Sequence, residues 1–393
     1  MNQATIDFIH AHAEADVRQL ALQGTKNPEV DLTFALEQIA GRQKAKTKLP
    51  TWATVDDIVY PPHLSMEQCS SEQTARYKAS IAGKGTLIVD LTAGFGVDMA
   101  FISQNYQKAV HVERQASLCA ISSQNYQHLG LNHIEVVCAD GVDYLHQLDH
   151  ADLIFLDPAR RDNHGARTYG IADCTPNILE LRDELLRKAD RVMLKLSPML
   201  DWRKTVEDLG NVSEVHIISV DNECKELLIV LEEKDKAKEY TVHCINLLSN
   251  GDKKEFVFCH KDISLTSHPS ALPSSFLLEP NASIMKAGCF AALEQRFGIQ
   301  QLDKNSHLFF SDTDISDFPG RRFVIEKTTS MNKRELKAAL AGIERANITV
   351  RNFPMSVAEL RKRLKLKDGG DLYLFATTIA DNQHQLFLCR KTE

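Results

Sequence analysis

Short apolar runs alternate with amphipathic stretches between residues 86 and 231, and this alternation constrains the fold more than any other feature of the sequence. The apolar runs are residues 86–91, 109–112, 134–138, 153–156 and 191–196. Strands that alternate with helices usually pair in parallel, because a parallel pair needs a long crossover connection. The sequence therefore predicts an α/β core built on a parallel sheet.

The last two runs of this region, 215–220 and 226–231, are joined only by residues 221–225. So short a connection leaves no room for a helical crossover, so these two strands must form a hairpin. We therefore expect a Rossmann-like sheet of seven strands in which the last strand is antiparallel to the others.

The rest of the 393-residue chain is long enough for further domains. Apolar residues at helical spacing predict a helical N-terminal segment over 1–60, and prolines near residue 60 mark its end. A sheet domain over 61–235 follows. Residues 236–320 form a linking α+β region, for which a ferredoxin-like arrangement is one interpretation, with strands at 240–248 and 255–260 and a helix at 287–297. Residues 321–393 read as a small β-α-β-α-β-β module.

Charge is distributed unevenly along the chain. The net charge is −7, yet residues 321–367 hold 13 Lys and Arg against four Glu, so this stretch carries +9 and the remainder −16. A basic module on an acidic protein suggests binding to a polyanion, and a merely solvated basic face is the alternative.

Several classes of protein are not expected. No apolar run approaches the ~18 residues of a membrane span, and the first residues lack the pattern of a signal peptide. The nine cysteines never form a Cys-x-x-Cys pair, and we do not expect the histidines to serve as metal ligands. We therefore expect a cytoplasmic protein with reduced thiols, no membrane partner and no metal.

A glycine-rich turn follows the first apolar run. Gly94 and Gly96 lie between Asp90 and the helical stretch that includes Met99. Glycine lets the backbone turn tightly and approach a ligand closely, so a nucleotide-like cofactor fits here. An ordinary loop is the alternative interpretation, and a nicotinamide-type motif would need a third glycine where Met99 stands.

Acidic residues end the next three runs: Glu113, Asp140 and Asp157. Open α/β sheets bind ligands at the carboxyl ends of their strands, so we expect these motifs to converge on one site. Glu113 could accept hydrogen bonds from both hydroxyls of a ribose. Taken singly, Glu113 and Asp140 could equally be surface or helix-cap carboxylates.

The motif residues occur along the chain in the order Asp90, Gly94, Gly96, Glu113, Asp140, Asp157 and Pro158. In this order they resemble the class I S-adenosylmethionine-dependent methyltransferases over roughly residues 65–231. Together with residues 68–72, 157–161, 321–391 and 351–354, the chain resembles bacterial methyltransferases that carry a C-terminal THUMP-like domain. THUMP-type modules bind RNA, chiefly tRNA, so the resemblance implies S-adenosylmethionine as cofactor and RNA as partner.

The resemblance also implies roles for individual residues. Asp90 and the backbone of Gly94 and Gly96 would hold the methionine moiety, Glu113 the ribose, and Asp140 the adenine amino group. The full expected cofactor set is Asp90, Thr92, Ala93, Gly94, Gly96, Asp98, Glu113, Asp140 and Gly141.

We expect the catalytic residues to be Asp157, Pro158 and Arg160, with Asp157 orienting or deprotonating the acceptor. Many amino-methylating relatives have a second proline and an aromatic ring where Ala159 and Arg160 stand, which weakens the case for base stacking. No cysteine in a Pro-Cys context is present for covalent attack on a pyrimidine. The expected substrate contacts are Arg161, Arg167, Tyr169, Lys195, Arg361, Lys362 and Arg363. A solvated connection is the alternative for the loop at 160–170.

The sequence thus predicts an S-adenosylmethionine-dependent methyltransferase that modifies tRNA or rRNA. Two alternatives stay open: a non-catalytic RNA-binding protein on a methyltransferase fold, and a methyltransferase for a protein or a small molecule. The oligomeric state is not predicted.

Overall fold

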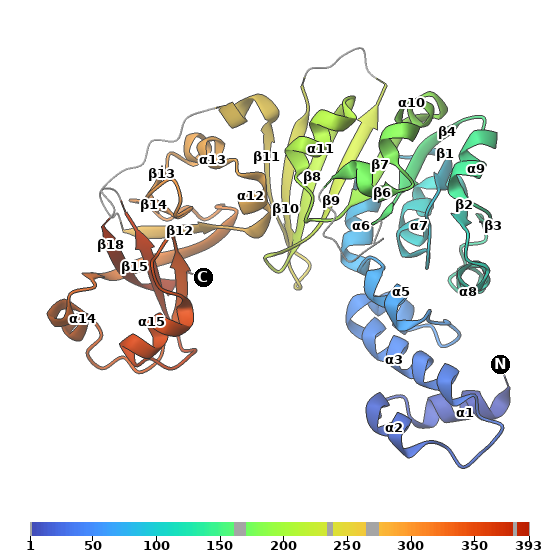
Figure 1. The fold of residues 1–393 in the computed structure, drawn as a ribbon, viewed down its shortest axis with the longest axis horizontal. Coiled ribbons are helices and arrows are strands. Elements are labelled where there is room, and N and C mark those ends of the chain that lie inside the picture. Colours follow the sequence, from blue (N-terminus) through green and yellow to red (C-terminus); the bar gives the residue numbers. More distant parts are fainter. Residues whose placement is uncertain (1, 161–169, 234–238, 265–274, 380–382, 393) are drawn as a thin grey trace. The chain divides into compact units, whose positions relative to one another are not determined.

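The computed structural model describes residues 2–160, 170–233, 239–264, 275–379 and 383–392 (Figure 1). The chain divides into two compact units. The first consists of Met1–Ser213 with Leu227–Ala237, and the second of Glu214–Glu226 with Lys238–Glu393. Within the described ranges, no helix combines the length and the apolar character needed to cross a membrane.

A mixed sheet of nine strands has the order β11-β10-β8-β9-β7-β4-β1-β2-β3. Its strands are β1 (Gly85–Asp90), β2 (Tyr106–Glu113), β3 (Ile134–Cys138), β4 (Ala151–Leu156), β7 (Ala189–Leu196), β8 (Val212–Val220), β9 (Glu223–Glu232), β10 (Thr241–Leu247) and β11 (Lys253–Cys259). Strands β1, β2, β3, β4 and β7 pair in parallel, and β9 pairs antiparallel with β7, as predicted.

The sheet has two strands more than the seven predicted. β10 pairs in parallel with β8, and β11 pairs antiparallel with β10. The apolar pattern indicates that residues 241–259 form strands, but it does not specify the sheet they join, because strand pairing is a tertiary choice. The α/β class is confirmed.

Helices flank the sheet of the first unit (Figure 1). They are α6 (Glu72–Ile81), α7 (Val97–Ile102), α8 (Ala116–His128), α9 (Gly141–Gln147), α10 (Ile178–Lys188) and α11 (Trp202–Leu209), with the short 3-10 turns η1 (Ser103–Asn105) and η2 (Ile171–Asp173). Because helices cover both faces of the central strands, residues 153–156 of β4 and 192–194 of β7 are fully buried. A two-residue ribbon, β5 (Ala159–Arg160) with β6 (Cys174–Thr175), follows β4.

The N-terminal helices belong to the first unit. They are α1 (Gln3–Ala11), α2 (Val17–Gln23), α3 (Leu32–Lys48), α4 (Pro50–Ala53) and α5 (His63–Gln68). The Gln38 side chain of α3 exchanges two hydrogen bonds with the backbone of Tyr60, and the Asn125 side chain of α8 exchanges two with Val59. The chain near residue 60 is therefore bonded both to the helices before it and to the sheet domain after it.

A seven-stranded sheet in the second unit has the order β13-β14-β12-β15-β18-β17-β16. Its strands are β12 (Phe276–Pro280), β13 (Gln300–Gln301), β14 (Phe309–Ser311), β15 (Gly320–Ser330), β16 (Asn347–Arg351), β17 (Leu372–Thr378) and β18 (His384–Lys391). The helices of this unit are α12 (Ala282–Ala287), α13 (Phe290–Phe297), α14 (Lys333–Ala339) and α15 (Val357–Leu364), with the 3-10 segment η3 (His260–Ser264). The helix expected at 287–297 is present as α13, but it begins later, at Phe290, because Gly288 adopts a left-handed φ of 64° and ends the preceding helix α12.

Side chains alternate between the two faces of β17 and β18. Leu374 and Leu386 pack with Leu336 of α14 and Leu360 of α15, whereas Phe375 and Phe387 pack in a separate cluster on the other face. Helices α14 and α15 therefore cover the same face of this sheet. The order from β15 to β18 is the predicted β-α-β-α-β-β.

Candidate cofactor and catalytic site

Four acidic side chains lie at the carboxyl ends of adjacent parallel strands. Asp90 ends β1, Glu113 ends β2, Asp140 follows β3 and Asp157 follows β4. The order β4-β1-β2-β3 makes these strands neighbours, so the four motifs share one edge of the sheet as predicted. In open α/β sheets this edge is where ligands bind.

The glycine turn is held by carboxylates on both sides. The Thr92 backbone N–H donates to Asp90 Oδ1 (2.9 Å), and the Gly94 N–H donates to Glu113 Oε2 (3.0 Å). The other oxygen of Glu113, Oε1, accepts from the Gln115 N–H (2.8 Å) at the start of α8. Glu113 thus fixes the turn and the next helix together.

Gly94 leaves room for a ligand. Its φ is 56°, and a Cβ atom placed there would meet no atom closer than the Thr92 carbonyl oxygen at 4.0 Å. A backbone with a left-handed φ and open space above it permits close approach by a ligand. Ala93 ties the turn to β2, since its N–H donates to the Val112 carbonyl (3.0 Å).

Gly96 serves the packing of the turn. A Cβ atom there would lie 2.0 Å from the Tyr126 Oη of α8, and φ is 82°. The Tyr126 hydroxyl donates to the Gly96 carbonyl (3.1 Å) and lies 2.8 Å from Nδ1 of His111. Burial lowers the pKa of His111 to about 3, so this ring is neutral, and burial raises the pKa of Tyr126. The sequence pattern gives no sign of this pair, because both residues stand at core positions.

Asp98 lies in a buried polar network that the sequence analysis also missed. Ser70 Oγ donates to Asp98 Oδ2 (2.7 Å), and the fully buried Lys78 ammonium lies 3.0 Å from Asp98 Oδ1. Burial opposes ionisation of Asp98, but the charges of Lys78 and Lys195 and the hydrogen bonds from Ser70 and Lys78 together hold its pKa below the usual value. Lys78 lies in helix α6, at a position that the apolar pattern of the sequence does not single out. The network anchors α7 to α6, and a direct role of Asp98 toward the cofactor stays a prediction.

Two further features shape the turn. Phe95, between the two glycines, packs edge-on against the buried Trp52 of α4, with ring centroids 5.1 Å apart. The N-terminal helices therefore contribute one wall of the glycine turn.

The pKa of the fully buried Asp90 is raised, first by burial and then by the nearby carboxylates Asp98 and Asp157.

At β3, Asp140 is the N-cap of α9, and its Oδ1 accepts from the Val142 N–H (2.8 Å). Gly141 lies against the end of β1, since a Cβ atom there would be 2.1 Å from the Leu91 carbonyl oxygen. The helix-cap alternative for Asp140 is thus observed, and it leaves Oδ2 available for a ligand. The side chain is exposed.

The structure places Lys195 of β7 on Asp157. Its ammonium donates to Asp157 Oδ2 (2.5 Å), because β7 and β4 are neighbouring strands. The Asp157 N–H donates to Thr92 Oγ1 (2.6 Å), which joins this motif to the glycine turn. Pro158 is buried.

The rest of the fourth motif is only partly described. Arg160 lies in β5, whose backbone pairs with β6. Arg161, Arg167 and Tyr169 lie outside the described residues.

In the second unit, the three expected contacts on α15 differ from one another. The Arg361 guanidinium donates to Asp368 Oδ1 (2.6 Å) and to the Ala346 carbonyl (3.2 Å), so it is engaged within the protein. Lys362 and Arg363 are exposed and form no ion pair with any residue that the structure describes.

Comparisons with known proteins agree with this architecture. A THUMP domain-like family model matches residues 320–391, and a ferredoxin-like domain model matches residues 276–319. No protein of curated function matches the chain.

Among solved structures, a candidate methyltransferase from Porphyromonas gingivalis W83 is 32% identical to this chain, with a TM-score of 0.89. The match covers 99% of this chain and 98% of that one. An rRNA methylase from Streptococcus thermophilus is 16% identical, covering 41% of this chain and 95% of its own (TM-score 0.32). TrmK from M. capricolum, in complex with S-adenosylhomocysteine, is 14% identical, covering 42% and 69% (TM-score 0.32).

The identity and nearly complete coverage of the first match, together with the THUMP-like model, show the family. The chain belongs with the Porphyromonas gingivalis protein to a bacterial family that has a class I methyltransferase fold and a C-terminal THUMP-like domain.

Proposed function

We propose that this chain is an S-adenosylmethionine-dependent methyltransferase that acts on RNA, namely tRNA or rRNA. The observation that carries the proposal is the convergence of Asp90, Glu113, Asp140 and Asp157 around an open glycine turn at one edge of a parallel sheet. Family membership with a candidate methyltransferase supports it.

The residues at this edge fit the cofactor. S-adenosylmethionine supplies a methyl group on a positively charged sulfonium. Each oxygen of Glu113 accepts one backbone N–H and keeps a further lone pair, so the carboxylate can accept both hydroxyls of a ribose. Asp140 Oδ2 can accept from an adenine amino group, and the space above Gly94 admits the methionine moiety.

Asp157 is suited to hold the acceptor. Methyl transfer is an in-line displacement, so most of the barrier reduction comes from positioning. Lys195 occupies Oδ2 of Asp157, and Oδ1 can accept a hydrogen bond from an N–H of the acceptor nucleotide and direct its lone pair. The carboxylate can then take up the proton that the methylated nitrogen releases.

The THUMP-like domain supplies a cationic face for RNA. Exposed cations that form no ion pair with the described residues lie on α14 and α15, which cover the same face of their sheet: Lys333, Arg334, Lys337, Lys362 and Arg363. Arg361 already donates a hydrogen bond to Asp368, so the proposed RNA contacts are these five residues. Unpaired lysines and arginines bind phosphates with release of counterions.

Calorimetry with S-adenosylhomocysteine tests the cofactor site. Glu113→Gln replaces one accepting oxygen by a donor and should weaken binding by about tenfold or more, since one hydrogen bond to a charged group contributes ~1.5–3 kcal/mol. Glu135→Gln is the matched control, because Glu135 is exposed on the neighbouring β3. Equal affinity in wild type and Glu113→Gln would show that the ribose lies elsewhere.

Salt titration of RNA binding tests the partner. The double variant Lys337→Ala/Lys362→Ala should lower the slope of log K against log salt by about 2. The double variant Lys84→Ala/Lys108→Ala, which removes two exposed lysines from the first unit, should keep the wild-type slope. Identical slopes for the two double variants would exclude this face as the RNA contact.

A further inference from the structure

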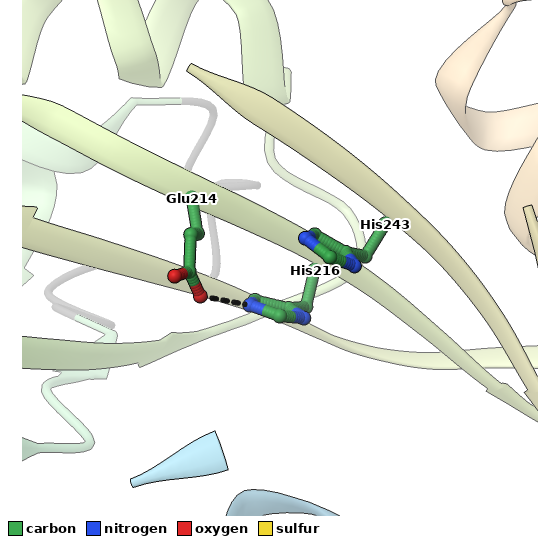
Figure 2. A group of neighbouring side chains, drawn as sticks. All are labelled: Glu214, His216 and His243. Carbon is green, nitrogen blue, oxygen red and sulfur yellow. Dashed lines mark hydrogen bonds and ion pairs between the residues drawn. The ribbon is translucent and has the colours of Figure 1, made fainter. Parts of the chain in front are cut away.

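A cluster of histidines and carboxylates lies outside the methyltransferase site, on one face of strands β8, β10 and β11. Glu214 and His216 are two residues apart on β8 and therefore share a face. His243 of β10 is the direct register partner of His216. Figure 2 shows the three side chains gathered beside one another on this face. The methyltransferase site makes no use of them.

The contacts within the cluster are close. Glu214 Oε2 lies 3.0 Å from Nε2 of His216, and the two imidazole rings are stacked with centroids 4.4 Å apart (Figure 2). One ligand atom from each of the three residues lies within 4.8 Å of the others. His216 is almost completely buried, with 1% of its surface exposed, whereas the Glu214 side chain is 31% exposed. The cluster is thus anchored in the sheet and reachable from its Glu214 side.

We infer that Glu214, His216 and His243 form a binding site for one divalent transition-metal ion of the Zn²⁺ class. Two imidazole nitrogens and one carboxylate oxygen form a donor set that such ions prefer. This donor set leaves at least one coordination position for water.

A fourth side chain supports the assignment independently. Glu255 of β11 lies 3.2 Å from Nδ1 of His243, and the Lys253 ammonium lies 2.7 Å from the other oxygen of Glu255. Histidines that bind metal ions almost always give their second ring nitrogen to a carboxylate or carbonyl, which fixes the tautomer. Glu255 therefore holds the proton of His243 on Nδ1 and leaves Nε2, which lies 3.3 Å from Thr241 Oγ1, to accept the ion.

The spacing also suits an ion. Two ligands of a tetrahedral ion, each ~2.0–2.1 Å from the metal, lie about 3.4 Å apart. The Glu214–His216 separation of 3.0 Å is thus a few tenths of an ångström too short and widens when an ion replaces the shared proton. The stacked His243 ring must turn about χ2 to bring Nε2 from Thr241 Oγ1 to the same point, and this torsion is soft. The partly exposed Glu255 side chain can follow Nδ1 through this turn.

The sequence could not reveal this group, because its members come from two strands. A His-x-x-x-His spacing occurs at His146 and His150, but α9 ends at Gln147, so these two histidines do not share a helix. Here the signal is Glu214-x-His216 on one strand, with His243 supplied by pairing that only the tertiary structure defines.

Metal titration of untagged, chelator-stripped protein tests the inference. We expect one Co²⁺ per chain with a visible absorption band and no thiolate charge-transfer band, and displacement of Co²⁺ by Zn²⁺. Glu214→Gln and His243→Gln should each weaken binding by about tenfold or more. The matched controls are Glu223→Gln, which alters an exposed glutamate on β9, and His260→Gln, which alters a histidine stacked on Tyr240, and both should bind as wild type does.

A second readout separates binding from folding. Zn²⁺ should raise the melting temperature of the wild type and of both controls, but not that of Glu214→Gln, whose side chain is partly exposed and whose fold should persist. The inference is overturned if wild-type protein takes up no ion, if Glu214→Gln binds with wild-type affinity, or if a thiolate band shows that cysteines hold the ion. Affinity for S-adenosylhomocysteine should stay unchanged in Glu214→Gln.

Discussion

Three glycines of the first unit share a left-handed backbone but differ in what a methyl group would meet. Gly94, Gly96 and Gly130 have φ values of 56°, 82° and 72°. Alanine at any of them incurs the left-handed penalty, about 1–2 kcal/mol. At Gly130 nothing lies within 4 Å of the new Cβ atom, at Gly94 only the Thr92 carbonyl at 4.0 Å, and at Gly96 the Tyr126 hydroxyl at 2.0 Å.

Gly96→Ala should therefore destabilise the first unit far more than its matched control Gly130→Ala. Displacing Tyr126, which is fully packed against His111, adds the cost of overpacking, about 1–3 kcal/mol. We expect a total of about 2–5 kcal/mol for Gly96→Ala, against about 1–2 kcal/mol for Gly130→Ala.

Urea unfolding followed by tryptophan fluorescence measures this difference. Both tryptophans, Trp52 and Trp202, lie in the first unit, so the signal reports that unit. Trp52 also packs on Phe95, next to the substituted glycine. Equal unfolding midpoints for Gly96→Ala and Gly130→Ala would refute the packing role of Gly96.

Gly94→Ala tests whether the space above Gly94 is needed for cofactor binding, apart from any effect on the free energy of unfolding. Its unfolding midpoint should match that of Gly130→Ala, because neither Cβ atom meets a close neighbour. Its affinity for S-adenosylhomocysteine should nevertheless fall by about tenfold or more, since the methyl group fills the space that the cofactor needs. Wild-type affinity in Gly94→Ala would place the cofactor elsewhere.

Three further predictions concern charged and titratable groups. The pKa of His111 is about 3 in the folded protein against 6.5 unfolded, so the unfolded state binds more protons between these values. The free energy of unfolding of the wild type should therefore fall, relative to that of His111→Asn, by up to about 1.4 kcal/mol per pH unit below pH 6.5. Urea unfolding at pH 5–7 measures both free energies, and the same pH dependence in both proteins would contradict this. Lys195→Ala should slow methyl transfer at least tenfold, because Asp157 loses the ammonium group that positions it. Calorimetry should show unchanged affinity for the cofactor. An unchanged rate of methyl transfer would refute the positioning role of Lys195. Glu279→Gln should destabilise the second unit by about 1–3 kcal/mol, because this buried carboxylate pairs with two arginines. Its control Glu326→Gln, which removes a surface ion pair, should cost under about 1 kcal/mol. Calorimetric melting compares the two variants, and equal effects would count against the buried pairing.

The sheet of the first unit was predictable because its central strands are covered on both faces. Residues 153–156 and 192–194 are continuous apolar runs, and β4 and β7 contain them. β8 begins earlier than expected, at Val212, since Ser213 and Glu214 are polar and their pairing with other strands does not show in the sequence. The break at Gly288 was missed for a similar reason: one residue with left-handed φ divides an otherwise helical pattern.

The candidate site was predictable only in part. A carboxylate at the end of each strand is visible in the sequence, so the convergence of the four acidic residues followed from sheet topology. The partners of buried polar groups were not visible, because Lys78, His111 and Tyr126 stand where a pattern analysis sees only core positions. Lys195 was assigned to the substrate, and the structure shows that it first pairs with Asp157.

Transfer of a labelled methyl group is the most direct test of the central claim. Purified protein is incubated with methyl-labelled S-adenosylmethionine and total RNA from cells that lack the gene, with Asp157→Asn as the variant and Asp143→Asn, an exposed residue of α9, as its control. We predict label in nuclease-sensitive material with wild type and Asp143→Asn, and none with Asp157→Asn. Absence of label despite measurable cofactor binding, or label only in protease-sensitive material, would contradict an RNA methyltransferase.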